Sequence, residues 1–567
     1  MRTVGATGTD AADGQVYRRL VDEYLQHLWT DDPAAATAHG VHQGDGRLGE
    51  YTVEAEQDYQ RRRRDLLDRL RRIDRGVLEP ADQVDYPFLM GLLEADASST
   101  AIWRGSHGPR DIRRTAFLPP QRITQALFPL MAGDFAPVEE RISSIVGRVN
   151  EIEAWLEQAR HTVTGVPELW LQRGVTAARA ARQFVVQAVP EFARASVPGN
   201  SRQIGEIERA ARRAAEALDA YERHLAGLTT GRSATAAGPH WAAGPEVVDD
   251  LLRHYHLLDM DHNDLYDFGL EEVDRYTGDL IRLARRMGYG DDWMTAIEEV
   301  KDHHPAAQEV VRAYEAEVQS ARSFMLEHEL VTVPPEGHCP TEWMPAFMRP
   351  FAAMGLPRPS PAFDPGYHGS WYIAPVDRSA AAEVQRDHLR ENNYAFIRAI
   401  SHHEIFPGHY MQYLVAKLSA TDIGKTHTSM INTEGWTLYW EEYLVELGYL
   451  GEPAQHLMQL RNALWRAVRV VVDAGLHCRG MTLDQAAGFL MEKARLDWRW
   501  AKSEAERYTV VPTNPSTYLL GKREVVNLKK AYRRLRGADF SDKEFHDHYL
   551  SFGTVPVRVI REAMLGG

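Results

Sequence analysis

The chain has 567 residues, with 65 Lys and Arg residues against 80 Asp and Glu residues, and a formal net charge of -15 at pH 7. This acidic balance argues against nucleic acid as the main partner, because proteins that bind phosphates usually carry an excess of basic residues. The length exceeds the usual limit for a single hydrophobic core, so we expect two lobes that share one continuous body.

The cysteine content and the start of the chain indicate its environment. Cys339 and Cys478 lie far apart and form no C-x-x-C motif, so neither a disulfide framework nor a thiolate zinc site is expected. Residues 1–14 are small and polar and lack the apolar core of a signal peptide. No segment approaches the roughly 18 apolar residues of a membrane span. We therefore expect a disordered N-terminus at residues 1–14, no membrane partner and a cytoplasmic protein.

The apolar pattern along the chain predicts a mainly α fold. Residues 15–240 are predicted to form an N-terminal helical lobe, because apolar residues recur there at spacings of three and four. The glycine-, alanine- and serine-containing segment 229–244 is the expected lobe boundary, and residues 241–567 form the second lobe. The helices expected in this lobe cover residues 245–330, 380–420 with a break near Pro407, 432–447, 452–477, 482–503, 518–536 and part of 538–567.

One short β element is expected in the second lobe. Residues 331–377 break the helical pattern with prolines, glycines and aromatic residues, and residues 371–374 are the most strand-like part of this segment. In helical metallopeptidases, an edge strand of this kind can bind the substrate backbone by β-augmentation. Tyr372 is therefore a candidate substrate-binding residue.

A histidine-rich segment at residues 401–412 predicts a metal site. Zinc peptidases use two neutral imidazoles as metal ligands and a nearby carboxylate that accepts a proton from the bound water. His403 and His409 are the candidate ligands, and Glu404 is the candidate general base. In the H-E-x-x-H motif the two histidines are four residues apart and share one helical face. His403 and His409 are instead six residues apart, which places them on different faces of a regular helix.

The residues between the two histidines predict how the helix is interrupted. Pro407 cannot donate the helical hydrogen bond, and Gly408 adopts backbone angles that other residues avoid. A break at these residues could turn His409 back toward His403. His402 is a candidate supporting residue, and the sequence leaves open that it replaces one of the two preferred histidines as ligand.

The third ligand is expected on a following helix. Glu434 lies 30 residues after Glu404, which leaves room for one helix, a turn and a second antiparallel helix. Glu441 lies close to the same helical face as Glu434 and could support the metal ligands from behind. A glycine inside a helix costs about 1 kcal/mol, so Gly435 indicates that another part of the chain approaches it closely.

These motifs together resemble a known family. The pairing of HEIFPGHYMQ (403–412) with EGWTLYWEE (434–442) is similar to the signatures HExxPGHxxQ and EGWALYxE of the bacterial metallohydrolase family called "domain of unknown function 885". Residues 366–372, 469–477, 507–508 and 518–522 resemble further segments of that family. The resemblance covers roughly residues 240–535. It implies a large zincin-like helical fold with two lobes around a cleft, distantly similar to the helical zinc carboxypeptidases.

The resemblance also assigns roles and reveals one departure. It implies that His477 and Tyr518 stabilise the negative oxygen of a tetrahedral intermediate. Alternatively, His477 is a hydrogen-bonded core histidine and Tyr518 only packs. Where the family pattern has Pro-Gly-Gln-Ala, this chain has Pro-Thr-Asn-Pro-Ser at residues 512–516, so the substrate preference of the family does not carry over directly.

The role of three basic residues can be interpreted in two ways. Arg507, Lys522 and Arg523 could bind a substrate carboxylate, as a dipeptidase or carboxypeptidase requires. They could instead form ion pairs with the neighbouring carboxylates of Glu504, Glu506 and Glu524.

The sequence therefore predicts a zinc metallohydrolase of the dipeptidase or carboxypeptidase type. Zn²⁺ would be held by His403, His409 and Glu434, and Glu404 would move the proton during attack on the amide bond of a short peptide or small amide. A mixed histidine and carboxylate site also suits manganese or cobalt. The alternatives are a hydrolase or C–N bond-cleaving enzyme for one small metabolite, such as a biosynthetic intermediate, and a non-catalytic binding protein on the same fold. The oligomeric state is not predicted.

Overall fold

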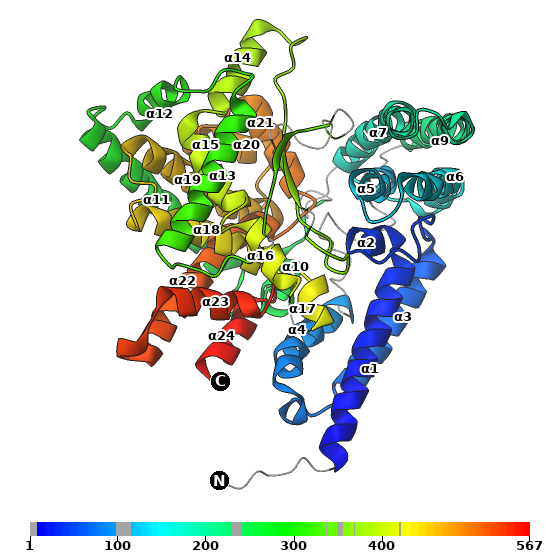
Figure 1. The fold of residues 1–567 in the computed structure, drawn as a ribbon, viewed down its shortest axis with the longest axis horizontal. Helices are drawn as coiled ribbons and strands as arrows, with labels where there is room; N and C mark the ends of the chain where they lie inside the picture. The colour runs from blue at the N-terminus through cyan, green and yellow to red at the C-terminus, as the bar shows by residue number, and fades with distance from the viewer. Residues whose placement is uncertain are drawn as a thin grey trace. The chain divides into compact units, whose positions relative to one another are not determined.

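The structure is a computed structural model that describes residues 8–97, 115–228, 241–335, 337–345, 348, 355–367, 369–418 and 421–566, with side chains from residue 13 onward. The prediction of a mainly α fold is confirmed, and a single small sheet accompanies the helices in the described residues (Figure 1). No helix in this part of the chain is long and apolar enough to cross a membrane.

The chain divides into two compact units. The first contains residues 1–241 and 361–365, and the second contains residues 242–360 and 366–567. The predicted boundary follows residue 240 and lies in a connection of which residues 229–240 are outside the described chain. The insertion of 361–365 into the first unit was not predicted; there the Phe363 backbone N–H donates to the carbonyl of His39, and Asp364 pairs with His42 at 2.8 Å.

The first unit consists of helices and their connections. Its α-helices are α1 (Gly8–Asp31), α2 (Pro33–Ala38), α3 (Val53–Leu70), α4 (Pro80–Ala97), α5 (Leu118–Ala132), α6 (Val138–Thr162), α7 (Glu168–Gln183), α8 (Val189–Ser196) and α9 (Ser201–Gly227). The expected disorder over residues 8–14 is wrong, because α1 already begins at Gly8. No proline interrupts this segment, and Ala11 and Ala12 favour the helix. Residues 1–7 lie outside the described residues.

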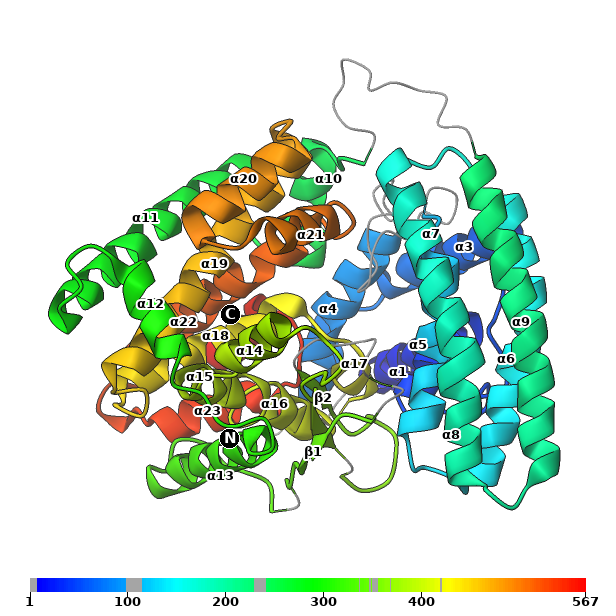
Figure 2. The same cartoon turned by 90° about the horizontal axis from the view of Figure 1, so that it is seen from above.

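The second unit contains the sheet and the helices that carry the candidate site (Figure 2). Its α-helices are α10 (Pro245–Asp250), α11 (His262–Met287), α12 (Trp293–Lys301), α13 (Val310–Glu327), α14 (Ala382–Glu391), α15 (Tyr394–Glu404), α16 (His409–Ala416), α17 (Asp422–Thr426), α18 (Met430–Glu446), α19 (Pro453–Cys478), α20 (Leu483–Ala494), α21 (Trp498–Tyr508), α22 (Thr517–Arg536), α23 (Asp542–Ser551) and α24 (Val557–Leu565).

Two predicted helices are interrupted by capping residues. The segment 380–420 breaks at residues 392–393 as well as near Pro407, because the Asn393 side chain accepts a hydrogen bond from the Phe396 N–H at 2.9 Å and starts α15. The segment 482–503 breaks where Arg495 adopts a left-handed conformation with φ of 57°. The Asp497 side chain then caps α21 by accepting from the Trp500 N–H at 3.0 Å.

The predicted strand exists, but it is not an edge strand. In the three-stranded sheet, β3 (Ser370–Ile373) lies between β1 (Thr341–Trp343), which runs parallel to it, and β2 (Gly355–Arg358), which runs antiparallel. Both edges of β3 are therefore paired, and the prediction that the strand of Tyr372 binds a substrate backbone is wrong. Aromatic and β-branched residues predict a strand, but they do not reveal which other segments pair with it.

Helices α18 and α22 make a close backbone contact in the second unit. A Cβ added to Gly435 would lie 2.3 Å from the backbone carbon of Gly521, and one added to Gly521 would lie 2.0 Å from the carbonyl oxygen of Ile431. The prediction that Gly435 accommodates a close approach is confirmed. This contact fixes where α18 lies against the helix that carries Tyr518.

We expect Gly435→Ala to lower the free energy of unfolding by about 1–3 kcal/mol or more, because the added methyl group forces the two backbones apart. Gly488→Ala in α20 is the matched control, since a Cβ there meets nothing within 4 Å. That variant should stabilise the protein by about 1 kcal/mol. Thermal unfolding midpoints measure both effects, and equal shifts of the same sign would contradict this account of the α18–α22 contact.

Candidate metal centre

The turn between α15 and α16 returns His409 to His403. A Cβ added to Gly408 would lie 1.7 Å from the carbonyl oxygen of His403, so only glycine allows the turn to fold against the end of α15. From α18, the Trp436 Nε1–H donates to the carbonyl of Pro407 at 2.7 Å and holds the turn in place. The rings of His403 and His409 consequently meet edge to face, with centroids 5.0 Å apart. The predicted break at Pro407 and Gly408 is confirmed.

Glu434 completes a cluster with these two imidazoles. One ligand atom from each of His403, His409 and Glu434 lies within 4.8 Å of the others. Glu434 Oε2 is 3.4 Å from His409 Nε2 and 3.8 Å from His403 Nε2. Glu434 is only 7% exposed, and its Oε2 has no hydrogen-bond partner in the described chain. Two imidazole nitrogens and one carboxylate oxygen that converge in this way fit the ligand set of a catalytic zinc site.

The electrostatics of the cluster keep Glu434 ionised. Burial raises the pKa of this carboxyl, but the imidazoles of His409 and His403 lower it more, to about 2. Burial lowers the pKa of His409, whereas the charge of Glu434 raises it, and the overall shift is upward. The ionised carboxylate therefore attracts a positive charge into the centre, and a bound cation would supply that charge in place of a proton on His409.

Glu441 supports His403 from the side away from Glu434. His403 Nδ1 donates a hydrogen bond to Glu441 Oε1 at 2.6 Å, which leaves Nε2 directed toward Glu434. Burial raises the pKa of Glu441, but Arg466 and His403 lower it overall. An imidazole that binds a metal commonly donates its other N–H to a carboxylate in this way, which fixes the ring orientation.

His402 is not part of the cluster. Its Nδ1 donates to the carbonyl of Arg398 at 2.9 Å, and its ring packs edge-on against Tyr449. Burial lowers its pKa to about 4, so the ring is neutral. The alternative in which His402 replaces His403 or His409 is therefore disfavoured by the direction in which the helix presents this ring.

Two tyrosines and the candidate base lie around the cluster. Glu404 is the last residue of α15, and its charge acts on His409 and on Tyr413. Tyr518 lies close enough to Glu434 to lower the pKa of that carboxyl. Tyr413, which the sequence analysis missed, stacks near His409 with ring centroids 6.3 Å apart. Its position four residues after His409, on the same face of α16, was the available signal.

Comparison with known proteins decides the family. The chain matches the family described as "Bacterial protein of unknown function (DUF885)" over residues 33–564. The chain belongs to this family. No curated protein matches it.

Two solved structures show that other proteins share the fold of this DUF885 protein. One is a protein of unknown function from Shewanella oneidensis, proposed to be a lipoprotein, with a TM-score of 0.78 and 20% identity over 98% of this chain and 99% of that chain. The other comes from Colwellia psychrerythraea and is also proposed to be a lipoprotein, with a TM-score of 0.83 and 19% identity over 97% of this chain and 98% of that chain. At this identity the similarity concerns the fold.

The structure contradicts the oxyanion role of His477. Its Nδ1 accepts a hydrogen bond from the Ala243 N–H at 3.1 Å, and its Nε2–H donates to the carbonyl of Tyr508 at 3.0 Å. Both ring nitrogens are thus occupied by the backbone, and burial lowers the pKa of the ring to about 4. In this DUF885 protein His477 is a hydrogen-bonded core histidine, which was the alternative that the sequence left open.

The basic residues predicted to bind substrate form ion pairs instead. Arg507 makes a two-pronged contact with Glu504, at 2.9 and 2.8 Å. Lys522 is buried and donates hydrogen bonds to Glu442 and to the Tyr276 hydroxyl. Neither partner was expected from the sequence.

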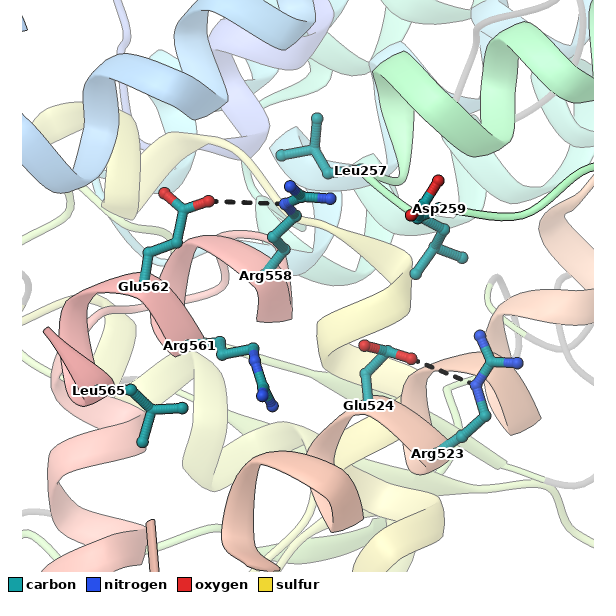
Figure 3. A pocket seen from close by; sticks show the side chains of 9 residues that line it. Leu257, Asp259, Arg523, Glu524, Arg558, Arg561, Glu562 and Leu565 are labelled. Atoms are coloured by element: carbon teal, nitrogen blue, oxygen red, sulfur yellow. Dashed lines mark hydrogen bonds and ion pairs between the residues drawn. The ribbon is translucent and has the colours of Figure 1, made fainter. Parts of the chain in front are cut away.

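Arg523 also has a partner and lies at a different cavity. It pairs with Glu524 at 3.2 Å. Both residues line a cavity of about 510 Å³ (Figure 3). None of the three clustered residues, His403, His409 and Glu434, belongs to its lining. The other residues that line it are Leu257, Leu258, Asp259, Arg558, Arg561, Glu562 and Leu565. The prediction that Arg507, Lys522 and Arg523 bind substrate is therefore disfavoured for all three.

The loop that departs from the family pattern is tied to α19. Asp473 accepts hydrogen bonds from the Ser516 hydroxyl at 2.5 Å and from the Thr513 N–H at 3.1 Å. Burial raises the pKa of Asp473 to about 7. Thr513 has a φ of 67°, and its hydroxyl pairs with His256 Nε2 at 2.8 Å. These contacts hold the start of α22, where Tyr518 is the second residue.

The geometry of the cluster leads to a test of its metal ligands. His409→Ala should abolish zinc binding, because it removes one of the three converging ligand atoms. His402→Ala, the matched control, removes the histidine next to His403 that lies outside the cluster and should retain about one zinc per chain. Metal analysis of the zinc-loaded and dialysed variants, with circular dichroism as a check on folding, measures this. Zinc retained by His409→Ala and lost from His402→Ala would restore the alternative ligand set.

The hydrogen bonds of His477 lead to a test of its structural role. His477→Ala leaves the Ala243 N–H and the Tyr508 carbonyl unpaired, at a cost of about 1–3 kcal/mol for each group. Because the folded pKa of His477 lies near 4, below its unfolded value of about 6.5, the wild type loses stability as pH falls through this window. Thermal midpoints at pH 7 and pH 5 should show a less stable variant with a smaller acid loss. Unchanged stability would contradict the structural role.

Proposed function

We propose that this protein is a zinc-dependent hydrolase that cleaves an amide bond in a short peptide or small amide, on a zincin-like helical fold. The observation that carries the proposal is the convergence of His403 Nε2, His409 Nε2 and Glu434 Oε2. An unpaired buried carboxylate oxygen costs free energy unless it interacts with a partner of opposite charge. A cation bound between the two imidazoles and Glu434 satisfies that requirement.

The ligand set favours zinc among the common cations. Zinc prefers histidine nitrogens together with a carboxylate oxygen, whereas magnesium and calcium prefer oxygen ligands alone. Manganese and cobalt also bind mixed sites of this kind, so metal analysis decides the identity of the ion. When bound, zinc supplies Lewis-acid activation of a water molecule and of the substrate carbonyl.

The residues around the cluster provide the proton transfer and the hydrogen bonds. Glu404 is placed next to the metal ligands at the end of α15, where its carboxylate accepts a proton from the attacking water and returns it to the departing amine. Burial raises the pKa values of Tyr413 and Tyr518, so both hydroxyls remain protonated at neutral pH. Each can donate a hydrogen bond to the carbonyl oxygen as it becomes negative.

The burial of the centre favours a small substrate. His403 is 3% exposed and Glu434 is 7% exposed, so a folded protein cannot bring its backbone to these side chains without unfolding locally. A short peptide or a small amide can enter such a site. The same burial excludes bulk water and strengthens the electrostatic interactions that stabilise the transition state.

One observation favours a second candidate function. The loop at residues 512–516 is held on Asp473 by the Thr513 N–H and by the Ser516 hydroxyl, and the family pattern Pro-Gly-Gln-Ala provides no such hydroxyl. A specialised loop at the start of the helix that carries Tyr518 would suit a hydrolase or C–N bond-cleaving enzyme for one small metabolite. A non-catalytic binding protein is less well supported, because Glu404 is retained next to the metal ligands.

The proposal predicts that Glu404→Gln binds zinc like the wild type but loses hydrolysis, because an amide cannot accept the proton from water. General acid–base catalysis usually contributes about 10²–10⁴-fold, so we expect a loss of that size in kcat. Zinc-loaded wild type and variant are compared on a panel of dipeptides and small amides, with the products separated by chromatography. Activity of the variant equal to that of the wild type would refute the role of Glu404, and a wild type without hydrolysis would refute the proposed function.

A further inference from the structure

Two buried arginines lie on the face of α19 that is directed toward the metal centre. Arg466 and Arg469 are three residues apart, and each is only 7% exposed. The guanidinium of Arg469 lies 5.1 Å from the ring centroid of Tyr518, and that of Arg466 lies 5.8 Å from it. Since Tyr518 also lies beside Glu434, both positive charges are placed next to the proposed zinc ligands.

Neither guanidinium makes a hydrogen bond within the part of the chain that the structure describes. The nearest carboxylates are Glu441, 3.6 Å from Arg466, and Glu504, 3.7 Å from Arg469, and both distances exceed hydrogen-bond length. The Nε atoms of the two arginines are buried and unpaired. A buried arginine normally has its donors satisfied, because leaving them unpaired costs free energy.

The neighbouring carboxylates are already engaged by other residues. Both oxygens of Glu504 accept hydrogen bonds from Arg507, and the Tyr508 hydroxyl donates to Oε2 at 2.6 Å. Glu441 Oε1 accepts from His403 at 2.6 Å. Arg469 therefore shares Glu504 with Arg507 and makes no hydrogen bond to it in the described chain.

Aromatic rings restrict the orientation of these guanidinium groups. Arg469 lies 4.0 Å from the ring centroid of Trp465, on α19, and 5.1 Å from that of Tyr518, on α22. Such contacts hold the group by cation–π attraction and reduce the entropy lost when it binds a ligand. The edge of a guanidinium carries parallel N–H groups whose spacing matches the two oxygens of a carboxylate.

We propose that Arg466 and Arg469 bind a carboxylate group of the substrate, and that the C-terminal carboxylate of a short peptide is the group bound. This inference rests on the proposed function, since it assigns the substrate class of the same centre. It replaces Arg507, Lys522 and Arg523, which are satisfied by Glu504, Glu442 and Glu524. A carboxylate held beside Tyr518 would place the adjoining amide bond near Glu434 and Glu404.

The test compares dipeptides with a free C-terminal carboxylate and the same dipeptides as C-terminal amides. A third set, of amides with an aspartate or glutamate side chain, distinguishes a side-chain carboxylate from the terminal one. Binding is measured by calorimetry on the zinc-loaded Glu404→Gln variant, in which turnover does not interfere. A hydrogen bond to a charged group corresponds to roughly a 10–100-fold difference in affinity, which we expect in favour of the free acids.

The variants remove the guanidinium groups one at a time and together. We expect two variants to bring the ratio of the affinities for the free acid and for the amide close to one. They are the single variant Arg469→Met and the double variant Arg466→Met/Arg469→Met. Arg523→Met is the matched control, because that arginine is exposed to a separate cavity and should leave the ratio unchanged. If the Met variants do not fold, Arg469→Lys carries the test, since it keeps the charge but loses the two-pronged contact and should lower the ratio partly.

The outcomes separate this inference from the proposed function. A ratio that collapses in the arginine variants and not in Arg523→Met supports the carboxylate site, even if the wild type hydrolyses none of the peptides. Equal affinity for acids and amides, preference for side-chain carboxylates alone, or no binding of any acid in the panel would overturn it. A ratio unchanged in the double variant would also overturn it, even if hydrolysis itself is observed.

Discussion

The buried carboxylate of Glu434, which faces two imidazole nitrogens and leaves one of its oxygens without a hydrogen bond, is the interaction on which the rest of this site depends. It requires two backbone approaches that only glycine permits. Gly408 lets the chain turn directly against the end of α15, and Gly435 lets α18 lie against Gly521 of α22. The contact of Trp436 with the carbonyl of Pro407 then links the turn to the helix that carries Glu434.

Helix α19 carries a second group of buried polar residues next to this arrangement. Arg466, Arg469, Asp473 and His477 follow one another at spacings of three and four, so they share one helical face, and all four are buried. At one end of this face the arginines lie beside Tyr518. At the other end, Asp473 holds the loop before α22, and His477 connects Ala243 to Tyr508. One helix therefore positions Tyr518 and carries the charges that surround it.

The fold and the site provide different kinds of information about function. Proteins from Shewanella oneidensis and Colwellia psychrerythraea share the fold at 19–20% identity, and at that level the fold alone does not imply an activity. The cluster of His403, His409 and Glu434 supports the proposed hydrolysis, and the guanidinium groups without hydrogen bonds support the proposed substrate class. Both inferences depend on burial, because a charge or a hydrogen-bond donor without a partner costs free energy only where water is excluded.

The sequence by itself determined the helical class, the three clustered residues and the break that brings them together. These features are encoded locally. They are the helical periodicity, the properties of Pro407 and Gly408, and the placement of Glu434 and Glu441 about two turns apart on a single helix face. The tertiary structure decided what depends on partners distant in the sequence. It placed β1 and β2 on both sides of the strand of Tyr372, and it occupied His477 and Lys522 with groups from other segments. It also left the guanidinium groups of Arg466 and Arg469 without a hydrogen bond in the described residues. The type of a side chain limits which groups it can bind. Only the packing of distant segments determines which of those groups lie within reach.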